Sequence, residues 1–159
     1  MKRAFAFICL VLIAVSLCSC RRTTNFSTVN FYYCATNPDH HTQTAVIQSE
    51  QRKIETNLSD LEGILRLYFV GPISNKLRSP FPSGTDLVNV QSSKEHVTIV
   101  LSDEISTLSG VDLMMACGCL ASTVLEISQS EVVQIRAETK LLNNQEFIEF
   151  TSQNLLSFS

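Results

Sequence analysis

The amino-acid sequence predicts an α+β domain built as a two-layer sandwich, with a mixed sheet and two helices on one face. Five short runs are rich in β-branched and aromatic residues, which is typical of strands. Only two segments carry apolar residues at helical spacing. The expected order is β-β-α-β-β-α-β, in which the few helices cover one face of the sheet and leave the other more open.

The five predicted strands follow the rule that residues two apart in a strand face the same side of the sheet. They span residues 28–34, 45–54, 86–91, 96–102 and 131–138. In the fourth strand, Val97, Ile99 and Leu101 mark the buried face. Residues 139–159 follow neither period clearly and fit a short helix or an edge strand.

The first predicted helix covers residues 57–70 and has an apolar stripe at spacings of three and four. The stripe consists of Leu58, Leu61, Leu65 and Phe69. Ser59 and Glu62 match a capping box at its start. Gly71 and Pro72 end the helix, because Gly tolerates the left-handed cap and Pro cannot continue the hydrogen-bond ladder.

The second predicted helix covers residues 109–128. Its buried stripe consists of Leu113, Cys117, Leu120, Val124 and Ile127. Small residues on the remaining faces make this helix slim enough to lie close to a sheet. Gly118 costs about 1 kcal/mol relative to Ala in the middle of a helix, so we expect close packing at this position to account for it.

Length and composition are typical of one domain with a short extension. The chain has 159 residues, of which 45% are hydrophobic, and this is enough for a single core. The net charge of −3 argues against binding to nucleic acid and against broad binding to anionic lipid head groups. Trp is absent, so no sugar-binding platform built from Trp is available.

Three of the six Cys residues lie beyond the N-terminal segment, at positions 34, 117 and 119. Cys117 and Cys119 point about 200° apart on a helix and cannot easily pair with each other. A disulfide between Cys34 and one of them is one interpretation for an exported chain. The other interpretation, which we favour, is three small buried residues.

The N-terminal segment has the three parts of an export signal. Lys2 and Arg3 precede an apolar run at residues 4–17, and small residues follow. The run is shorter than the roughly 20 residues that a membrane span needs. We therefore expect residues 1–19 to be a signal peptide.

The end of this segment, Leu17-Cys18-Ser19-Cys20, resembles the lipobox of bacterial lipoproteins. The resemblance implies that the bond before Cys20 is cut and that Cys20 carries the lipid. Residues 20–27 would then be the lipidated Cys and a short tether. The alternative is an ordinary secretion signal cut near Ser19, with Cys20 an incidental thiol.

No catalytic, cofactor-binding or metal-binding residues are predicted. His40 and His41 stand beside Asp39, but adjacent His side chains point in different directions, and no third ligand follows at a suitable spacing. A nucleophile elbow of the Gly-x-Ser-x-Gly type is absent. His96 is expected to be exposed, and nothing in the sequence indicates a lowered thiol pKa for a Cys–His enzyme.

The remaining carboxylates fit structural positions. Asp60 and Glu62 open the first predicted helix, where negative charge is favourable for the helix dipole. Asp103 and Glu104 follow a predicted strand.

Residues 28–140 resemble the GerMN domain family of sporulation and spore germination proteins. The matching motifs are the Phe31-Tyr32-Tyr33 strand, the helix leading into Gly71-Pro72, the Pro82-Ser83-Gly84-Thr85 segment and the Val97–Ser102 strand. The resemblance implies a fold similar to the ring-building modules of secretion-type complexes. It also implies a non-catalytic accessory protein, with residues 141–159 as a C-terminal extension.

These features predict an extracytoplasmic protein held on the cell membrane by lipid on Cys20. Its partners would be envelope or sporulation proteins, or a second copy of itself, contacted through a strand edge or the open sheet face. The alternative is a lipoprotein that binds a small ligand, such as a peptidoglycan fragment or a germinant. A hydrolase is the least supported hypothesis.

Overall fold

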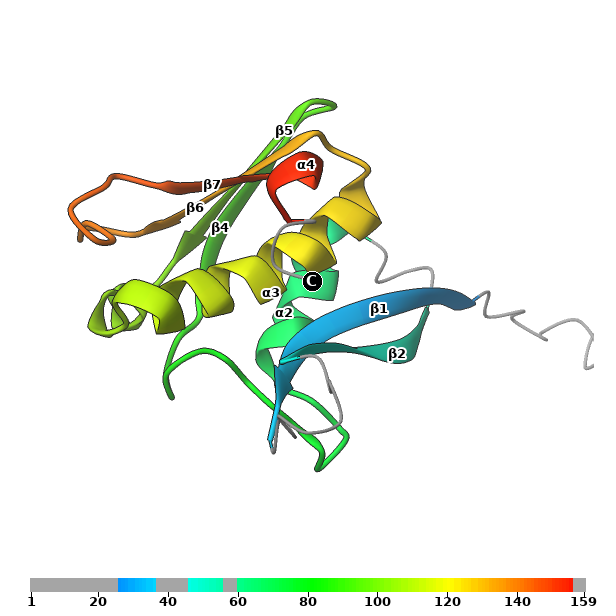
Figure 1. Cartoon of the computed structure of the whole chain (residues 1–159). Coiled ribbons are helices and arrows are strands. Elements are labelled where there is room, and N and C mark those ends of the chain that lie inside the picture. Colours follow the sequence, from blue (N-terminus) through cyan, green and yellow to red (C-terminus); the bar gives the residue numbers. More distant parts are fainter. Residues whose placement is uncertain (1–25, 37–45, 56–59, 156–159) are drawn as a thin grey trace, which may run out of the picture.

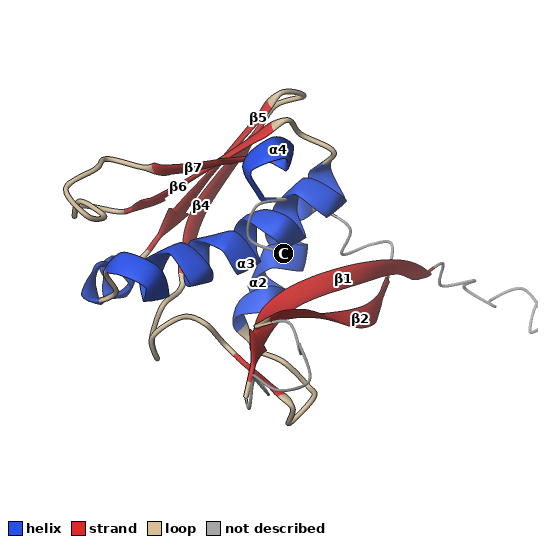
Figure 2. Cartoon of the chain, in the orientation of Figure 1, coloured by secondary structure: helices blue, strands red, loops and turns tan. Residues whose placement is uncertain are grey.

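The computed structural model describes residues 26–36, 46–55 and 60–155 (Figure 1). Within these ranges the strands form two sheets, with orders β2-β1-β3 and β4-β5-β6-β7. The predicted α+β class is confirmed. The single mixed sheet is corrected to two sheets, and Figure 2 shows helices between them.

The three-stranded sheet is built on a long hairpin. β1 (Phe26–Ala35) runs antiparallel to β2 (Ile47–Glu55), and the two strands pair over most of their length. β3 (Leu77–Arg78) pairs only with the last two residues of β1. Both long strands occur close to where the sequence predicts them.

The four-stranded sheet is mixed. β4 (Leu87–Ser92) pairs antiparallel with β5 (His96–Leu101), and β5 pairs parallel with β6 (Val132–Ala137). β7 (Ile148–Thr151) adds an antiparallel edge, and the short helix α4 (Ser152–Leu155) follows it. The tail that the sequence leaves unassigned therefore supplies both an edge strand and a short helix.

Two helices lie between the sheets. α2 (Leu61–Phe69) contacts β4, while α3 (Gly110–Ser128) packs against β1 on one side and against β6 and β7 on the other (Figure 1). A 3-10 helix, η2 (Asp103–Thr107), leads from β5 towards α3. For the four-stranded sheet alone the prediction of helices on one face holds, and the hairpin adds a third layer beyond them.

The split into two sheets has a visible cause at the inner edge of β1. The backbone N–H of Tyr32 donates to the Thr123 hydroxyl on α3 (3.0 Å), so a helix side chain takes the place of a strand partner. Glu126, one turn further along α3, accepts hydrogen bonds from the Asn30 amide (2.6 Å) and the Tyr32 hydroxyl (2.8 Å). α3 therefore covers the edge that a single continuous sheet would need.

The start of α2 differs in detail from the prediction. Ser59, half of the predicted capping box, lies outside the described residues. Asp60 is the N-cap without a side-chain hydrogen bond, and Glu62 pairs with Arg66 one turn later (2.7 Å). The predicted stop is confirmed, because Gly71 follows the helix with φ +98°, a conformation that favours Gly.

α3 has 19 residues and is long and apolar enough to span a membrane by length and composition alone. In this fold it is a core helix instead. Its buried residues face both sheets: Leu113, Ala116, Cys117, Gly118, Cys119, Leu120, Ala121, Thr123 and Val124.

The expectation that close packing explains Gly118 is not met. A Cβ built on Gly118 would have Phe150 Cε1 of β7 as its nearest neighbour, at 4.0 Å, which is an ordinary van der Waals contact. The structure therefore has room for a methyl group at this position, although the neighbouring residues of the helix are buried.

We predict that Gly118→Ala raises the free energy of unfolding by about 0.5–1 kcal/mol, because Ala loses less backbone entropy than Gly in a helix. Urea denaturation measures the change. Gly71→Ala is the matched control and should lower stability, because Gly71 has φ +98°. A loss of stability in Gly118→Ala would contradict the prediction.

Candidate interaction surface

The side chain of Arg52 on β2 lies over two aromatic rings of β1. Its guanidinium carbon is 4.9 Å from the centroid of the Phe31 ring and 5.8 Å from that of Tyr33. It also forms an ion pair with Glu50 at 2.6 Å, and the two side chains are only 13% and 12% exposed. A cation stacked on aromatic rings and shielded from water interacts more strongly than one at an open surface.

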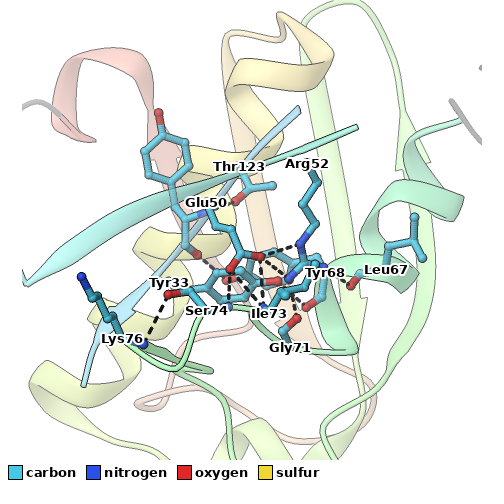
Figure 3. Close-up of polar contacts among 11 residues, drawn as sticks. Tyr33, Glu50, Arg52, Leu67, Tyr68, Gly71, Ile73, Ser74, Lys76 and Thr123 are labelled. Carbon is cyan, nitrogen blue, oxygen red and sulfur yellow. Dashed lines mark hydrogen bonds and ion pairs between the residues drawn. The ribbon is translucent and has the colours of Figure 1, made fainter. Parts of the chain in front are cut away.

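The same ion pair holds the loop that follows α2, as Figure 3 shows. Arg52 donates to the carbonyl of Gly71 at 2.6 Å and, in a longer contact of 3.5 Å, to that of Leu67. Glu50 accepts from the backbone N–H groups of Ile73 (3.0 Å) and Ser74 (2.7 Å). Arg52 thus donates hydrogen bonds to carbonyl groups at the end of α2, where a positive charge is favourable.

The environment of Glu50 lowers the pKa of its carboxyl. Burial by itself raises the pKa, but the backbone N–H groups of Ser74 and Ile73 and the Arg52 guanidinium outweigh this effect. The charged form of Glu50 is therefore the form that the folded structure stabilises.

Below this ion pair, two tyrosines join β1 to α2. The rings of Tyr33 and Tyr68 stack with their centroids 4.8 Å apart. The Tyr33 hydroxyl donates to the carbonyl of Tyr68 (2.9 Å), and the Tyr68 hydroxyl donates to the carbonyl of Tyr32 (2.9 Å). Both buried hydroxyls thus have partners, and the helix end is fixed relative to the strand.

The loop held in this way carries two exposed aliphatic side chains, Val70 at 81% and Ile73 at 80% exposed. We call these two residues the apolar tip. Single exposed apolar residues are common on protein surfaces. Here two of them stand on a short loop whose backbone is fixed by an ion pair, which is the arrangement of a preorganised contact point.

The outer strands offer a second type of surface. β2 carries Glu50, Arg52, Lys53 and Glu55, and charged residues on an edge strand oppose pairing with another chain. β4 carries no charged residue, and no other strand of the described ranges pairs with its outer edge. The open face of this sheet is polar, with Gln134 donating to Glu149 across β6 and β7 (2.9 Å).

The residues considered for chemistry from the sequence are only partly described by the structure. Cys20, Asp39, His40 and His41 lie outside the described residues. His96 is exposed at the start of β5, as predicted. Within the described ranges, no group of three or more His, Cys, Asp or Glu side chains could hold a metal ion.

Asp103 has a structural position at the start of η2. It accepts hydrogen bonds from the hydroxyl and the backbone N–H of Thr139 and from the N–H of Lys140. The Thr139 hydroxyl and N–H lower the pKa of this carboxyl. Asp103 therefore fastens the segment after β6 to the start of η2.

The three Cys residues of the domain are buried and free, which is the interpretation that the sequence favours. The Sγ atoms of Cys34 and Cys119 lie 4.0 Å apart. The expectation that nothing lowers a thiol pKa is wrong for Cys34, because the Cys119 thiol stabilises its charged form.

Sequence reasoning missed Glu50, Arg52, Val70 and Ile73. A usable signal exists for the ion pair, since Glu50 and Arg52 are two residues apart and therefore share one face of a strand. Two opposite charges on a strand face that otherwise packs against aromatic residues indicate that another segment of the chain covers this face and binds them.

We predict that Glu50→Gln lowers the free energy of unfolding by about 1–3 kcal/mol at neutral pH, because two backbone N–H groups and a guanidinium lose a charged acceptor. The folded-state pKa of Glu50 is lowered, so its contribution is present above the ordinary Glu pKa of about 4.3 and is lost as the pH falls through the lowered value. The gap between wild type and variant should therefore close on acidification.

Urea denaturation between neutral and acid pH measures this gap. Glu62→Gln is the matched control, because the pair of Glu62 with Arg66 is exposed and is expected to contribute less than about 0.5 kcal/mol. Equal effects of the two substitutions, or a gap that does not depend on pH, would contradict the prediction.

A comparison of the chain with known protein families gives a match. Residues 30–143 match the family model described as Germane, sporulation and spore germination. None of the curated proteins matches the sequence.

Two solved structures are similar to the chain. The tandem GerMN domains of the sporulation protein GerM from Bacillus subtilis share 16% identity with a TM-score of 0.59, over 84% of this chain and 48% of that chain. This chain thus spans about half the length of that structure. A candidate lipoprotein from Clostridium perfringens shares 18% identity with a TM-score of 0.46, over 82% of this chain and 90% of that chain.

The first structural similarity supports the fold, and the second is too distant to carry an argument. The family match covers well over half of the chain. It includes the second half of β1, the loop after α2 that Glu50 and Arg52 hold, and α3. The resemblance to the GerMN domain is thereby confirmed, and this chain belongs to the Germane family of sporulation and spore germination proteins.

Proposed function

We propose that this chain is an extracytoplasmic lipoprotein whose Germane domain binds another envelope or sporulation protein and catalyses no reaction. Lipid on Cys20 would hold it on the cell membrane. The domain would serve as an accessory in sporulation, germination or envelope assembly, in agreement with the description of its family.

The observation that carries the proposal is the apolar tip, on the loop after α2 that Glu50 and Arg52 hold in place. Val70 and Ile73 expose aliphatic side chains, while Glu50 and Arg52 hold the backbone beneath them. A fixed contact point loses little conformational entropy on binding. Its partner would present an apolar depression that takes both side chains, with β4 as an additional uncharged edge for strand pairing.

A non-catalytic role is supported by what the polar groups of the described residues do. The ion pairs Glu50–Arg52 and Glu62–Arg66 are engaged in holding a loop and a helix. Asp103 fastens a connection, and His96 lies at a strand end. An enzyme of the hydrolase type would need a nucleophile and a base that converge on one cleft. Cys34, Arg78 and Asp112 line one pocket, but the described residues on its wall include no His that could activate the thiol.

The second candidate is a ligand-binding lipoprotein for a peptidoglycan fragment or a germinant. A pocket of about 350 Å³ favours it, with Arg78, Thr107 and Asp112 on its wall. This volume lies at the lower end of the range for small-molecule sites. The two candidates differ in the residues they need, because ligand binding in this pocket does not involve the apolar tip.

We predict that Ile73→Asp, alone or with Val70→Asp, reduces the yield of specific crosslinks between the native lipoprotein and its envelope partner by about tenfold or more, as at an interface hot spot. Crosslinking in membranes followed by mass spectrometry measures the yield. Val111→Asp is the matched control, because Val111 is also 76% exposed but lies at the start of α3. Unchanged crosslinks in the tip variants would refute the interaction at this site.

For the anchor, we predict that Cys20→Ser releases the protein from the membrane fraction, because the acylated thiol is lost. Partition into detergent after fractionation measures the attachment. Cys18→Ser is the matched control and should stay attached, because the lipobox accepts Ser at that position. Equal attachment of wild type and Cys20→Ser would overturn the lipid anchor while leaving the interaction surface untested by this result alone.

A further inference from the structure

Cys34 and Cys119 bring two thiols from different layers of the fold into contact. Cys34 is near the end of β1, and Cys119 lies in the middle of α3, 85 residues later. Their Sγ atoms are 4.0 Å apart, and both side chains are buried. To form a disulfide, the two Sγ atoms would have to approach each other by about 2 Å, to the S–S bond length of about 2.05 Å.

The two thiols are not equally accessible. Cys34 lines the pocket of about 350 Å³, whereas Cys119 is not part of its wall. Arg78 of β3 also lines this pocket and is the register partner of Cys34 across the β1–β3 pair. A reagent entering from solvent therefore meets Cys34 first, beside a guanidinium, with Cys119 behind it.

The hydrogen bond between the two thiols favours the thiolate at Cys34. It is the main effect that lowers the pKa of the Cys34 thiol; burial raises this pKa, Arg78 lowers it and Asp112 raises it. The hydrogen bond with Cys34 and burial raise the pKa of the Cys119 thiol. The position of Cys34 on the pocket wall, beside Arg78, makes it the attacking thiol, and Cys119 in contact with it is the resolving thiol.

We propose that Cys34 and Cys119 form a redox-active pair that is oxidised through the pocket to a disulfide joining β1 to α3. The oxidant is a disulfide compound, either a low-molecular-weight disulfide or the exposed disulfide of a thiol oxidoreductase. This inference is independent of the proposed function, because the pair lies inside the domain and needs neither the anchor nor the apolar tip.

The reaction is two successive thiol–disulfide exchanges. The Cys34 thiolate attacks one sulfur of the oxidant, so that a mixed disulfide forms and the first thiol of the oxidant leaves. Cys119 then attacks the Cys34 sulfur, the mixed disulfide breaks, and the second thiol leaves. The two protein thiols lose two electrons and two protons, and the oxidant becomes two thiols.

Cys117 provides an internal comparison. It lies two residues from Cys119 on the same helix, so its side chain points about 200° away. Burial alone raises the pKa of its thiol to about 12. The proposal therefore assigns reactivity to Cys119 and not to Cys117.

The test is oxidation of the full-length chain with oxidised glutathione, followed by trypsin digestion and mass spectrometry without reductant. Cleavage after Arg and Lys leaves Cys34 in the peptide 23–52 and both Cys117 and Cys119 in the peptide 95–136. We expect these peptides to appear as one linked species, about 2 Da lighter than their sum. Reductant should separate them again.

Three variants resolve the pairing. Cys117→Ala should still form the linked species, whereas Cys34→Ala and Cys119→Ala should not. Cys34→Ala should also abolish the mixed disulfide with glutathione on the peptides 23–52 and 95–136, while Cys119→Ala should accumulate it on the peptide 23–52, because the resolving thiol is absent. Cys9, Cys18 and Cys20 fall in the separate peptide 4–21 and do not affect this readout. Near-ultraviolet circular dichroism checks that each variant is folded.

Two results would overturn the proposal. One is a folded wild-type chain that forms no linked peptide with oxidised glutathione. The other is a linked peptide that persists in Cys119→Ala, which would place the bond at Cys117. In the wild-type chain, the oxidised form should also melt roughly 5–15 °C higher than the reduced form, because the bond closes a long loop.

Discussion

The fold depends on how it accommodates Arg52. A guanidinium taken out of water is costly unless ion-pair and hydrogen-bond partners compensate for its lost hydration. Here the rings of Phe31 and Tyr33 lie beneath it, Glu50 neutralises it, and the carbonyl of Gly71 accepts from it. These partners come from β1, β2 and the end of α2, so satisfying one charge fixes three elements relative to one another.

A second constraint acts at the opposite edge of β1. Thr123 accepts from the N–H of Tyr32 and donates to the carbonyl of Cys119 (3.0 Å), so one hydroxyl serves both the strand and the helix. α3 is thereby fixed to the β1–β2 hairpin on one side, while its other side covers the four-stranded sheet. The three layers follow from this double use of a single helix, whose small residues allow both sheets to approach.

The sequence predicts the positions of helices and strands better than it predicts which of them lie side by side. Periodicity placed α3 at residues 109–128, and the structure has Gly110–Ser128. Periodicity says which face of a strand is buried, but it does not say which strand lies beside it, so the split into two sheets could not be read from Tyr32 or Thr123. The apolar tip was missed for a related reason, since periodicity places Val70 at the end of the predicted helix 57–70 but does not show that its side chain is exposed.

The two proposed properties of the domain, binding through the apolar tip and oxidation of Cys34 and Cys119, are connected through β1. Glu50 and Arg52 on β2 hold the apolar tip in one position, and the Cys34–Cys119 contact lies close to them, because Arg52 stacks on Tyr33, the residue before Cys34 at the same end of β1. A bond there would fasten the end of β1 to α3 at a point where Cys34 is opposite Ile47 of β2 on one side and Arg78 of the two-residue strand β3 on the other. Oxidation would thus add a covalent link to α3 at the same end of β1 that Arg52 ties to the loop after α2, so both proposed properties depend on how this end of the strand is held.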